Sequence, residues 1–210
     1  MVKYPEYAKE LKDLLKRDQQ AWRTFWKDNN KVQDQPLFKT KFERVRKGQK
    51  KRSVRMLEIL KDINEPFMSN IGADAAQAIS VIAVHDSISI IRQVLAAFMK
   101  CYERDQANTY IQAIPSLTDR LLLLERKPQR YGTMWESEPS PSNECFLPTV
   151  EDFKNVNKRR KEFGIEPLRW PKSLAMPESE QPWLQRPLSE LVMRDITDEE
   201  FEKNYVNYIE

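Results

Sequence analysis

The sequence predicts a mainly α-helical fold, a bundle of about five to six helices followed by a long, irregular, proline-rich C-terminal strap. Apolar residues recur at the three- and four-residue spacing of helices, and strict strand-like alternation is nearly absent. Only four glycines occur among 210 residues, which argues against the glycine-rich phosphate loops of nucleotide-binding α/β proteins. Most of the 13 prolines follow Lys127, where they predict irregular structure.

A chain of this length suits one domain with appendages. We expect residues 1–168 to form the helical domain, interrupted by a basic loop at about residues 38–55. Residues 169–210 are expected to form an extended strap, rich in Pro and Trp, that ends in a short acidic helix.

The predicted helices of the bundle follow in order along the first 125 residues. The first fades near Asn29, and the second ends before Pro66. The third opens after Gly72, the fourth follows Ser87, and the fifth opens at Pro115. Their apolar stripes are Leu11, Leu14, Leu15, Trp22, Phe25 and Trp26; Met56, Ile59, Leu60 and Ile63; Ala75, Ile79, Ile82 and Ala83; Ile91, Val94, Leu95, Phe98, Met99 and Tyr102; and Leu117, Leu121 and Leu124.

From Lys127 onward the sequence predicts an ordered loop or lid and one later helix. Residues Thr149–Asp152 resemble a capping box, and Gly164 is a fitting end for the helix between them. In the strap, Trp170 and Trp183 are expected to pin the chain to the bundle.

The net charge of +3 is unevenly distributed. Residues 39–55 are strongly basic, and the chain after Trp170 is acidic. A basic run can bind phosphates or nucleic acid, or it can be a solvated segment, or it can face the acidic tail. Because no known nucleic-acid-binding motif interleaves with the lysines, we favour the last two interpretations and do not expect a nucleic-acid partner.

No apolar run reaches the roughly 20 residues that a membrane span requires, and the N-terminus lacks the pattern of a secretory signal. Cys101 and Cys145 form neither a metal-type pair nor a disulfide framework; Cys101 is interpreted as a buried apolar residue. We therefore expect a cytoplasmic protein without membrane contact.

The only histidine, His85, lies late in the third predicted helix, next to the apolar stripe of Ile82 and Ala78. It is either a structural residue with one hydrogen bond or a proton carrier. With a single histidine and no cysteine pair, we expect neither a metal nor a cofactor. Asp119 and Arg120, in the leucine-rich fifth helix, are either an internal ion pair or an anion-binding couple.

Two further groups are candidates for a polar site. Asp18 lies near the inner face of the first helix, and Arg159 and Arg160 offer two guanidinium groups. The loop after the fifth helix carries Gln129, Tyr131 and Thr133, either as ligands for a polar molecule or as a tight turn that satisfies the helix end.

These motifs resemble those of a mainly bacterial family that is catalogued only as a domain of unknown function. The resemblance covers residues 11–168, and its most specific parts are Asp119-Arg120 and Gln129-x-Tyr131-Gly132-Thr133. The other matching residues are Asp18, Gln19, Arg23, Gly72, His85, Leu117, Thr118, Arg159, Arg160, Gly164 and Leu168. Val84 and Met134 stand where family members usually have Gln. The resemblance implies that the polar residues act as one set, and it implies no particular activity.

Two hypotheses follow, and the sequence leaves open whether the chain is an enzyme. In the first, the chain binds a small, anionic molecule or is a metal-independent acid–base enzyme with a pocket around His85. The pocket would be lined by Asp18, His85, Asp119, Arg120, Gln129, Tyr131 and Thr133. His85 would carry the proton, Asp119 or Asp18 would orient it, and Arg120 would hold the anionic group. In the second, the chain is a non-catalytic module with a protein partner, and the polar residues are a structural network.

Overall fold

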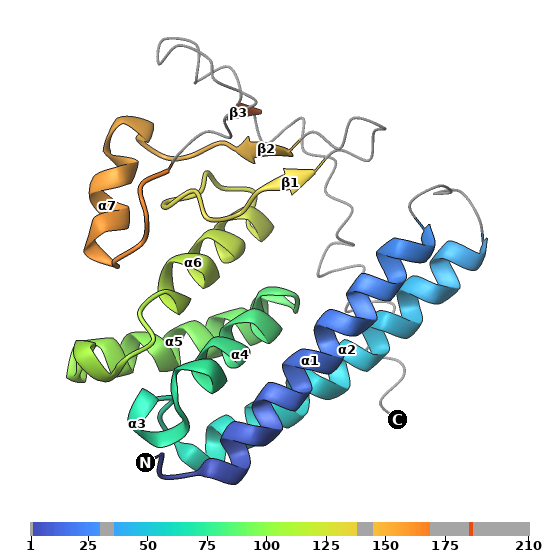
Figure 1. Cartoon of the computed structure of the whole chain (residues 1–210). Coiled ribbons are helices and arrows are strands. Elements are labelled where there is room, and N and C mark those ends of the chain that lie inside the picture. The colour runs from blue at the N-terminus through green and yellow to red at the C-terminus, as the bar shows by residue number, and fades with distance from the viewer. Residues whose placement is uncertain (1, 30–35, 138–144, 169–184, 187–210) are drawn as a thin grey trace. The chain divides into compact units, whose positions relative to one another are not determined.

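A computed structural model describes the chain at residues 2–29, 36–137, 145–168 and 185–186. The described residues are mainly helical, so the predicted fold class is confirmed (Figure 1). Two compact units divide the chain. Unit 1 comprises Met1–Thr118 and Phe163–Ile165, and unit 2 comprises Asp119–Glu162 and Glu166–Glu210. The division falls inside one helix, between Thr118 and Asp119.

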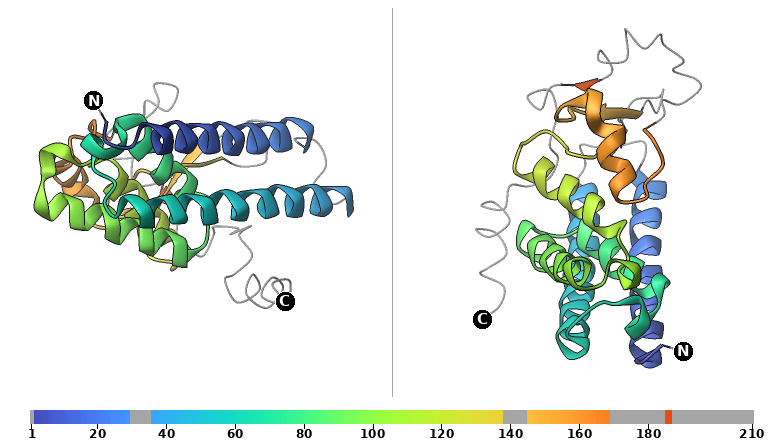
Figure 2. Two further views of the ribbon diagram at one scale, coloured as in Figure 1. Left: turned by 90° about the horizontal axis from the view of Figure 1, so that it is seen from below. Right: turned by 90° about the vertical axis from the view of Figure 1, so that its left-hand side faces the viewer.

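Unit 1 begins with two long helices, α1 (Pro5–Asn29) and α2 (Pro36–Ile63). Both helices start with proline, whose missing N–H and fixed φ suit the first helical position. They run side by side in opposite directions (Figures 1 and 2).

The structure corrects the predicted basic loop, because residues 38–55 lie inside α2. Lysine and arginine are good helix formers, and aromatic contacts hold the first turns of α2 against α1. The ring of Phe25 in α1 lies 5.1 Å from that of Phe38 and 5.6 Å from that of Phe42. Sequence reasoning missed these helical turns because the cationic residues hide the narrow apolar stripe.

The remaining helices of unit 1 are shorter. Gly72, at φ 81°, separates α3 (Met68–Ile71) from α4 (Ala73–Val84). Small buried residues of α4, such as Ala76 and Ala83, let it pack against both α1 and α2. Helix α4 is followed by α5 (Ile88–Arg104), the 3-10 turn η1 (Gln106–Asn108) and α6 (Ala113–Leu124). The fully buried core includes Leu11, Met56, Ile59, Ile79, Ile82, Ile91, Phe98 and Leu117.

The described part of unit 2 contains the second half of α6, short strands and the helix α7. Strand β1 (Glu136–Ser137) pairs antiparallel with β2 (Cys145–Pro148), which pairs in parallel with β3 (Gln185–Arg186). The 3-10 turn η2 (Phe153–Asn155) leads into α7 (Val156–Glu162). A small core forms around Val150 and Val156, against which Trp135, Phe153 and Leu168 pack.

The predicted capping box at residues 149–152 does not start a helix. Val150 instead forms a parallel bridge with Gln129, and Asp152 takes a left-handed conformation at φ 42° before η2. Gly164, at φ 61°, follows shortly after α7, as expected of a helix-ending glycine. Apart from β3, the predicted strap and its last helix lie outside the described residues. Within the described parts of the chain, no helix has both the length and the apolar character needed to span a membrane.

Candidate functional site

A polar cluster in unit 1 joins one residue of α1, one residue of α2 and the residue that follows α4, three helices that pack against one another. Asp18 comes from the middle of α1, and Arg52 comes from α2. His85 is the residue directly after α4, rather than part of that helix as predicted. Because these helices pack in pairs, the three side chains meet although 34 and 67 residues separate Asp18 from its partners.

The carboxylate of Asp18 is the centre of this cluster. Its side chain is 0% exposed, and Oδ1 accepts hydrogen bonds from Arg52 Nε at 3.0 Å and Nη2 at 2.7 Å. Oδ2 lies 2.9 Å from Nδ1 of His85. A guanidinium partner favours the ionised carboxylate, which can only accept. Nδ1 of His85 therefore carries the proton of this hydrogen bond, and whenever the ring holds only this one proton, Nε2 is left as an acceptor.

The His85 ring remains reachable from solvent, since its side chain is 37% exposed. Among the described residues, Nε2 has no hydrogen-bond partner. The indole of Trp22 lies beside the imidazole, with ring centroids 6.1 Å apart. Its Nε1 is buried and has no partner within the described part of the chain, a situation that costs about 1–3 kcal/mol.

The backbone at His85 is also held by α2. The guanidinium of Arg46 donates to the His85 carbonyl at 2.9 Å, and the amide of Gln49 donates to the same oxygen. One residue further, the hydroxyl of Ser53 donates to Asp86. These contacts fix both the position of His85 and, through Asp18, the orientation of its ring.

A second polar cluster lies in unit 2 around Asp119, which is 0% exposed. Its Oδ1 accepts from the backbone N–H groups of Arg130 at 2.8 Å and Tyr131 at 2.9 Å. Its Oδ2 accepts from the backbone N–H and the hydroxyl of Thr133, each at 2.8 Å. Burial raises the pKa of the Asp119 carboxyl above its ordinary value, although these hydrogen bonds act in the opposite direction.

The loop at residues 129–134 is closed by side chains that satisfy its backbone. The buried amide of Gln129 exchanges hydrogen bonds with the N–H and carbonyl of Met134, at 2.8 and 3.0 Å. The guanidinium of Arg160 donates to the Tyr131 carbonyl at 2.7 Å, and that of Arg159 donates to the Arg130 carbonyl at 2.8 Å. This arrangement matches the tight turn that was one of the two interpretations of the motif.

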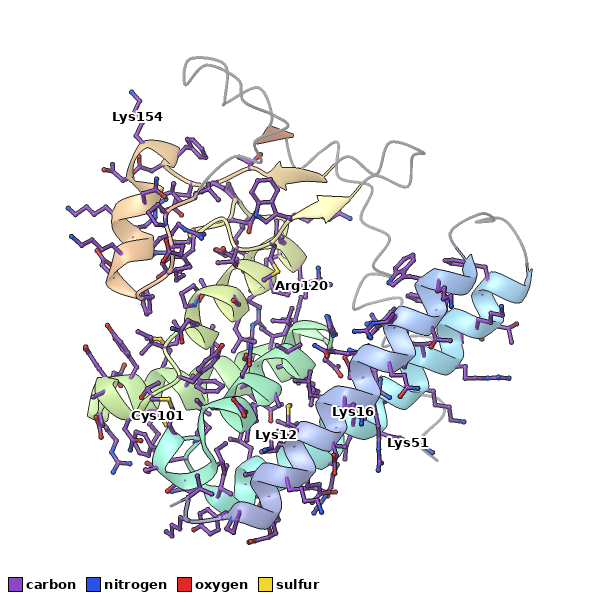
Figure 3. All side chains as sticks on the ribbon, viewed as in Figure 1. Lys12, Lys16, Lys51, Cys101, Arg120 and Lys154 are labelled. Atoms are coloured by element: carbon purple, nitrogen blue, oxygen red, sulfur yellow. The ribbon has the colours of Figure 1, made fainter. Side chains whose placement is uncertain are left out.

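The predicted site residues thus fall into two sets, one in each unit. Asp18 and His85 meet in unit 1, whereas Asp119, Gln129, Tyr131 and Thr133 build the loop of unit 2. Arg120, labelled in Figure 3, is half-buried on α6. The carboxylate of Asp119 is held by loop N–H groups and a hydroxyl rather than by the predicted ion pair.

Sequence reasoning missed the residues that α2 contributes, namely Arg46, Gln49, Arg52 and Ser53. Their spacing of three and four places them on one face of a helix. That signal was hidden because the segment was interpreted as a loop.

No group of His, Cys, Asp or Glu side chains in the ranges that the structure describes gathers in a way that could hold a metal ion. A shallow hollow of about 260 Å³ opens on the surface of α1, apart from the residues that hold His85. It is lined by Glu6, Lys9, Glu10, Asp13, Leu14 and Arg17. Comparison of the chain with protein-family models, with curated proteins and with solved structures finds no match.

Proposed function

We propose that the chain is an acid–base enzyme for a small anionic molecule, with His85 as its proton carrier. The observation that supports this most is the pairing of a fully buried Asp18 with a partly exposed imidazole at 2.9 Å. A carboxylate on Nδ1 holds histidine in the tautomer whose Nε2 can accept a proton. Asp18 is a positioning residue in this proposal and His85 is the catalytic residue.

The charges around His85 support an anionic substrate. The guanidinium of Arg46 contacts the His85 carbonyl, whereas the charge of Arg52 is balanced by the carboxylate of Asp18. Cations beside a proton carrier attract negative groups and stabilise negative charge that develops during proton transfer. The reaction class is hydrolysis or another acid–base transfer. The orienting role goes to Asp18 rather than Asp119, which serves the loop of unit 2.

The test uses the fact that His85 is the only histidine, so every imidazole NMR signal belongs to it. Small carboxylates and phosphate monoesters are added one at a time, and compounds that shift the ring signals are then assayed for turnover. The test variant is His85→Asn. The asparagine amide can take the place of Nδ1 against Asp18, and the substitution removes Nε2. We expect His85→Asn to melt near the wild-type temperature and to lose turnover by about 10²–10⁴-fold. Turnover that survives in His85→Asn would refute the proposal.

One observation favours the second hypothesis, a non-catalytic interaction module, for part of the chain. The buried groups of Asp119 and Gln129 are saturated by the loop that they hold, as a structural network requires. If this is their whole role in an interaction module, Asp119→Asn should weaken both folding and partner capture. His85→Asn should then change neither, whereas the enzyme proposal predicts that His85→Asn abolishes turnover.

A further inference from the structure

Gly48 is the one glycine of the chain whose presence the backbone does not explain. Gly72, Gly132 and Gly164 have φ values of 81°, 64° and 61°, a region that other residues rarely adopt. Gly48 instead lies in the middle of α2. At such a position, glycine lowers the folding equilibrium constant about five-fold relative to alanine. Some other feature must therefore favour a missing side chain at residue 48.

The neighbouring side chain of Arg52 supplies that feature. A Cβ atom at residue 48 would lie 3.1 Å from Nη1 of Arg52 and 4.0 Å from its Cζ. The two residues are four apart, and helical side chains lean back toward the preceding turn. The guanidinium of Arg52 thus occupies the space beside the Cα of Gly48.

Arg52 has little freedom to move away. Its Nε and Nη2 both donate to Oδ1 of Asp18, at 3.0 and 2.7 Å, and its side chain is only 12% exposed. A displacement of a few tenths of an ångström would lengthen both hydrogen bonds to a fully buried carboxylate. The same carboxylate contacts His85 through its other oxygen.

We propose that Gly48 is a positioning residue for the His85 site. Its missing side chain lets Arg52 fold back along α2 and hold Asp18 with Oδ2 directed at Nδ1 of His85. The catalytic consequence rests on the proposed function, but the positioning does not. Both can therefore be tested separately.

The experiment is a double-mutant cycle between Gly48→Ala and Arg52→Gln, read by urea unfolding and by the ¹⁵N NMR signals of the His85 ring. The matched reference is a pair of substitutions at Lys51, which is exposed on the same helix and extends into solvent (Figure 3). The folding equilibrium constant of Lys51→Ala should be about five-fold larger than that of Lys51→Gly, because alanine has the higher helix propensity.

At residue 48 we expect the opposite sign. Gly48→Ala should lower the folding equilibrium constant of the wild type and reduce the population of the Nδ1–H tautomer of His85. In the Arg52→Gln background the same change should raise the constant by about five-fold, as at Lys51. If Arg52→Gln does not fold, Arg52→Lys serves as the background, since its flexible ammonium can leave the space beside Gly48.

A gain in stability from Gly48→Ala in the wild type, with the His85 tautomer unchanged, would overturn the proposal. This outcome differs from failure of the proposed function, which would appear as turnover that persists in His85→Asn. The double-mutant cycle needs no substrate, so its result depends only on whether Arg52 occupies the space beside Gly48.

Discussion

Replacement of Asp18 by asparagine should reverse the tautomer of His85. Asparagine has the same shape, but one of its two terminal groups is an amide donor. Arg52 donates to Oδ1 through two nitrogens, so the carbonyl oxygen of Asn must occupy that side. The amide then faces Nδ1 of His85, which must accept, and the ring proton moves to Nε2.

The size of the effect follows from the hydrogen bond that is lost. A hydrogen bond to a charged group contributes about 1.5–3 kcal/mol, which corresponds to a change of about 10- to 150-fold in the ratio of the two neutral tautomers. Because Arg52 would also lose its buried counter-charge, the free energy of unfolding should fall by about 1–3 kcal/mol.

Two measurements on the single histidine check this prediction. The ring ¹⁵N shifts at alkaline pH distinguish Nδ1–H in the wild type from Nε2–H in Asp18→Asn. Carbethoxylation of the ring, which needs an unprotonated nitrogen that solvent can reach, should slow in the variant. Asp13→Asn, at an exposed residue of α1, is the control and should alter neither signal. A wild-type ring that carries its proton on Nε2 would refute the reasoning, as would an Asp18→Asn variant that keeps Nδ1–H.

Three further predictions concern other buried groups. Burial raises the pKa of Asp119, so the folded state holds this proton more tightly than the unfolded chain. The contribution of Asp119 to the free energy of unfolding therefore falls as pH rises from about 4. Urea unfolding at a series of pH values should show that Asp119→Asn removes this dependence on pH. An unchanged dependence in the variant would contradict the prediction. Burial raises the pKa of the Cys101 thiol from 9.0 to about 11. In a Cys145→Ser background, iodoacetamide at pH 8 should therefore label the folded chain at least about 100-fold more slowly than the unfolded chain. Equal labelling rates would show that Cys101 is not buried. Arg160→Lys should lower the free energy of unfolding by about 1–3 kcal/mol. One ammonium cannot replace a guanidinium that donates to the carbonyls of Tyr131 and Glu166, each at 2.7 Å. The control is Lys158→Ala, at an exposed position of α7, which should change the free energy of unfolding by less than about 0.5 kcal/mol.

The sequence by itself determined the helices whose apolar residues repeat with a clear period. The stripe of Ile91, Val94 and Phe98 predicts α5, and the small residues after Gly72 predict α4, because burial of one face imposes a periodicity that any reader of the chain can see. The same reasoning failed for the first half of α2. Its helical turns are covered with cations, and aromatic contacts with α1 hold its inner face.

The tertiary structure alone decided which polar residues meet. Asp18 and His85 were both candidates, but nothing local to either one names the other or brings in Arg52 from a third helix. Asp119 was expected to serve the same site, whereas its carboxylate binds the loop at residues 130–133 within unit 2. Helical periodicity is a property of neighbouring residues, and a hydrogen bond between distant residues depends on how the helices pack. A sequence therefore predicts which polar residues are buried more readily than it predicts their partners.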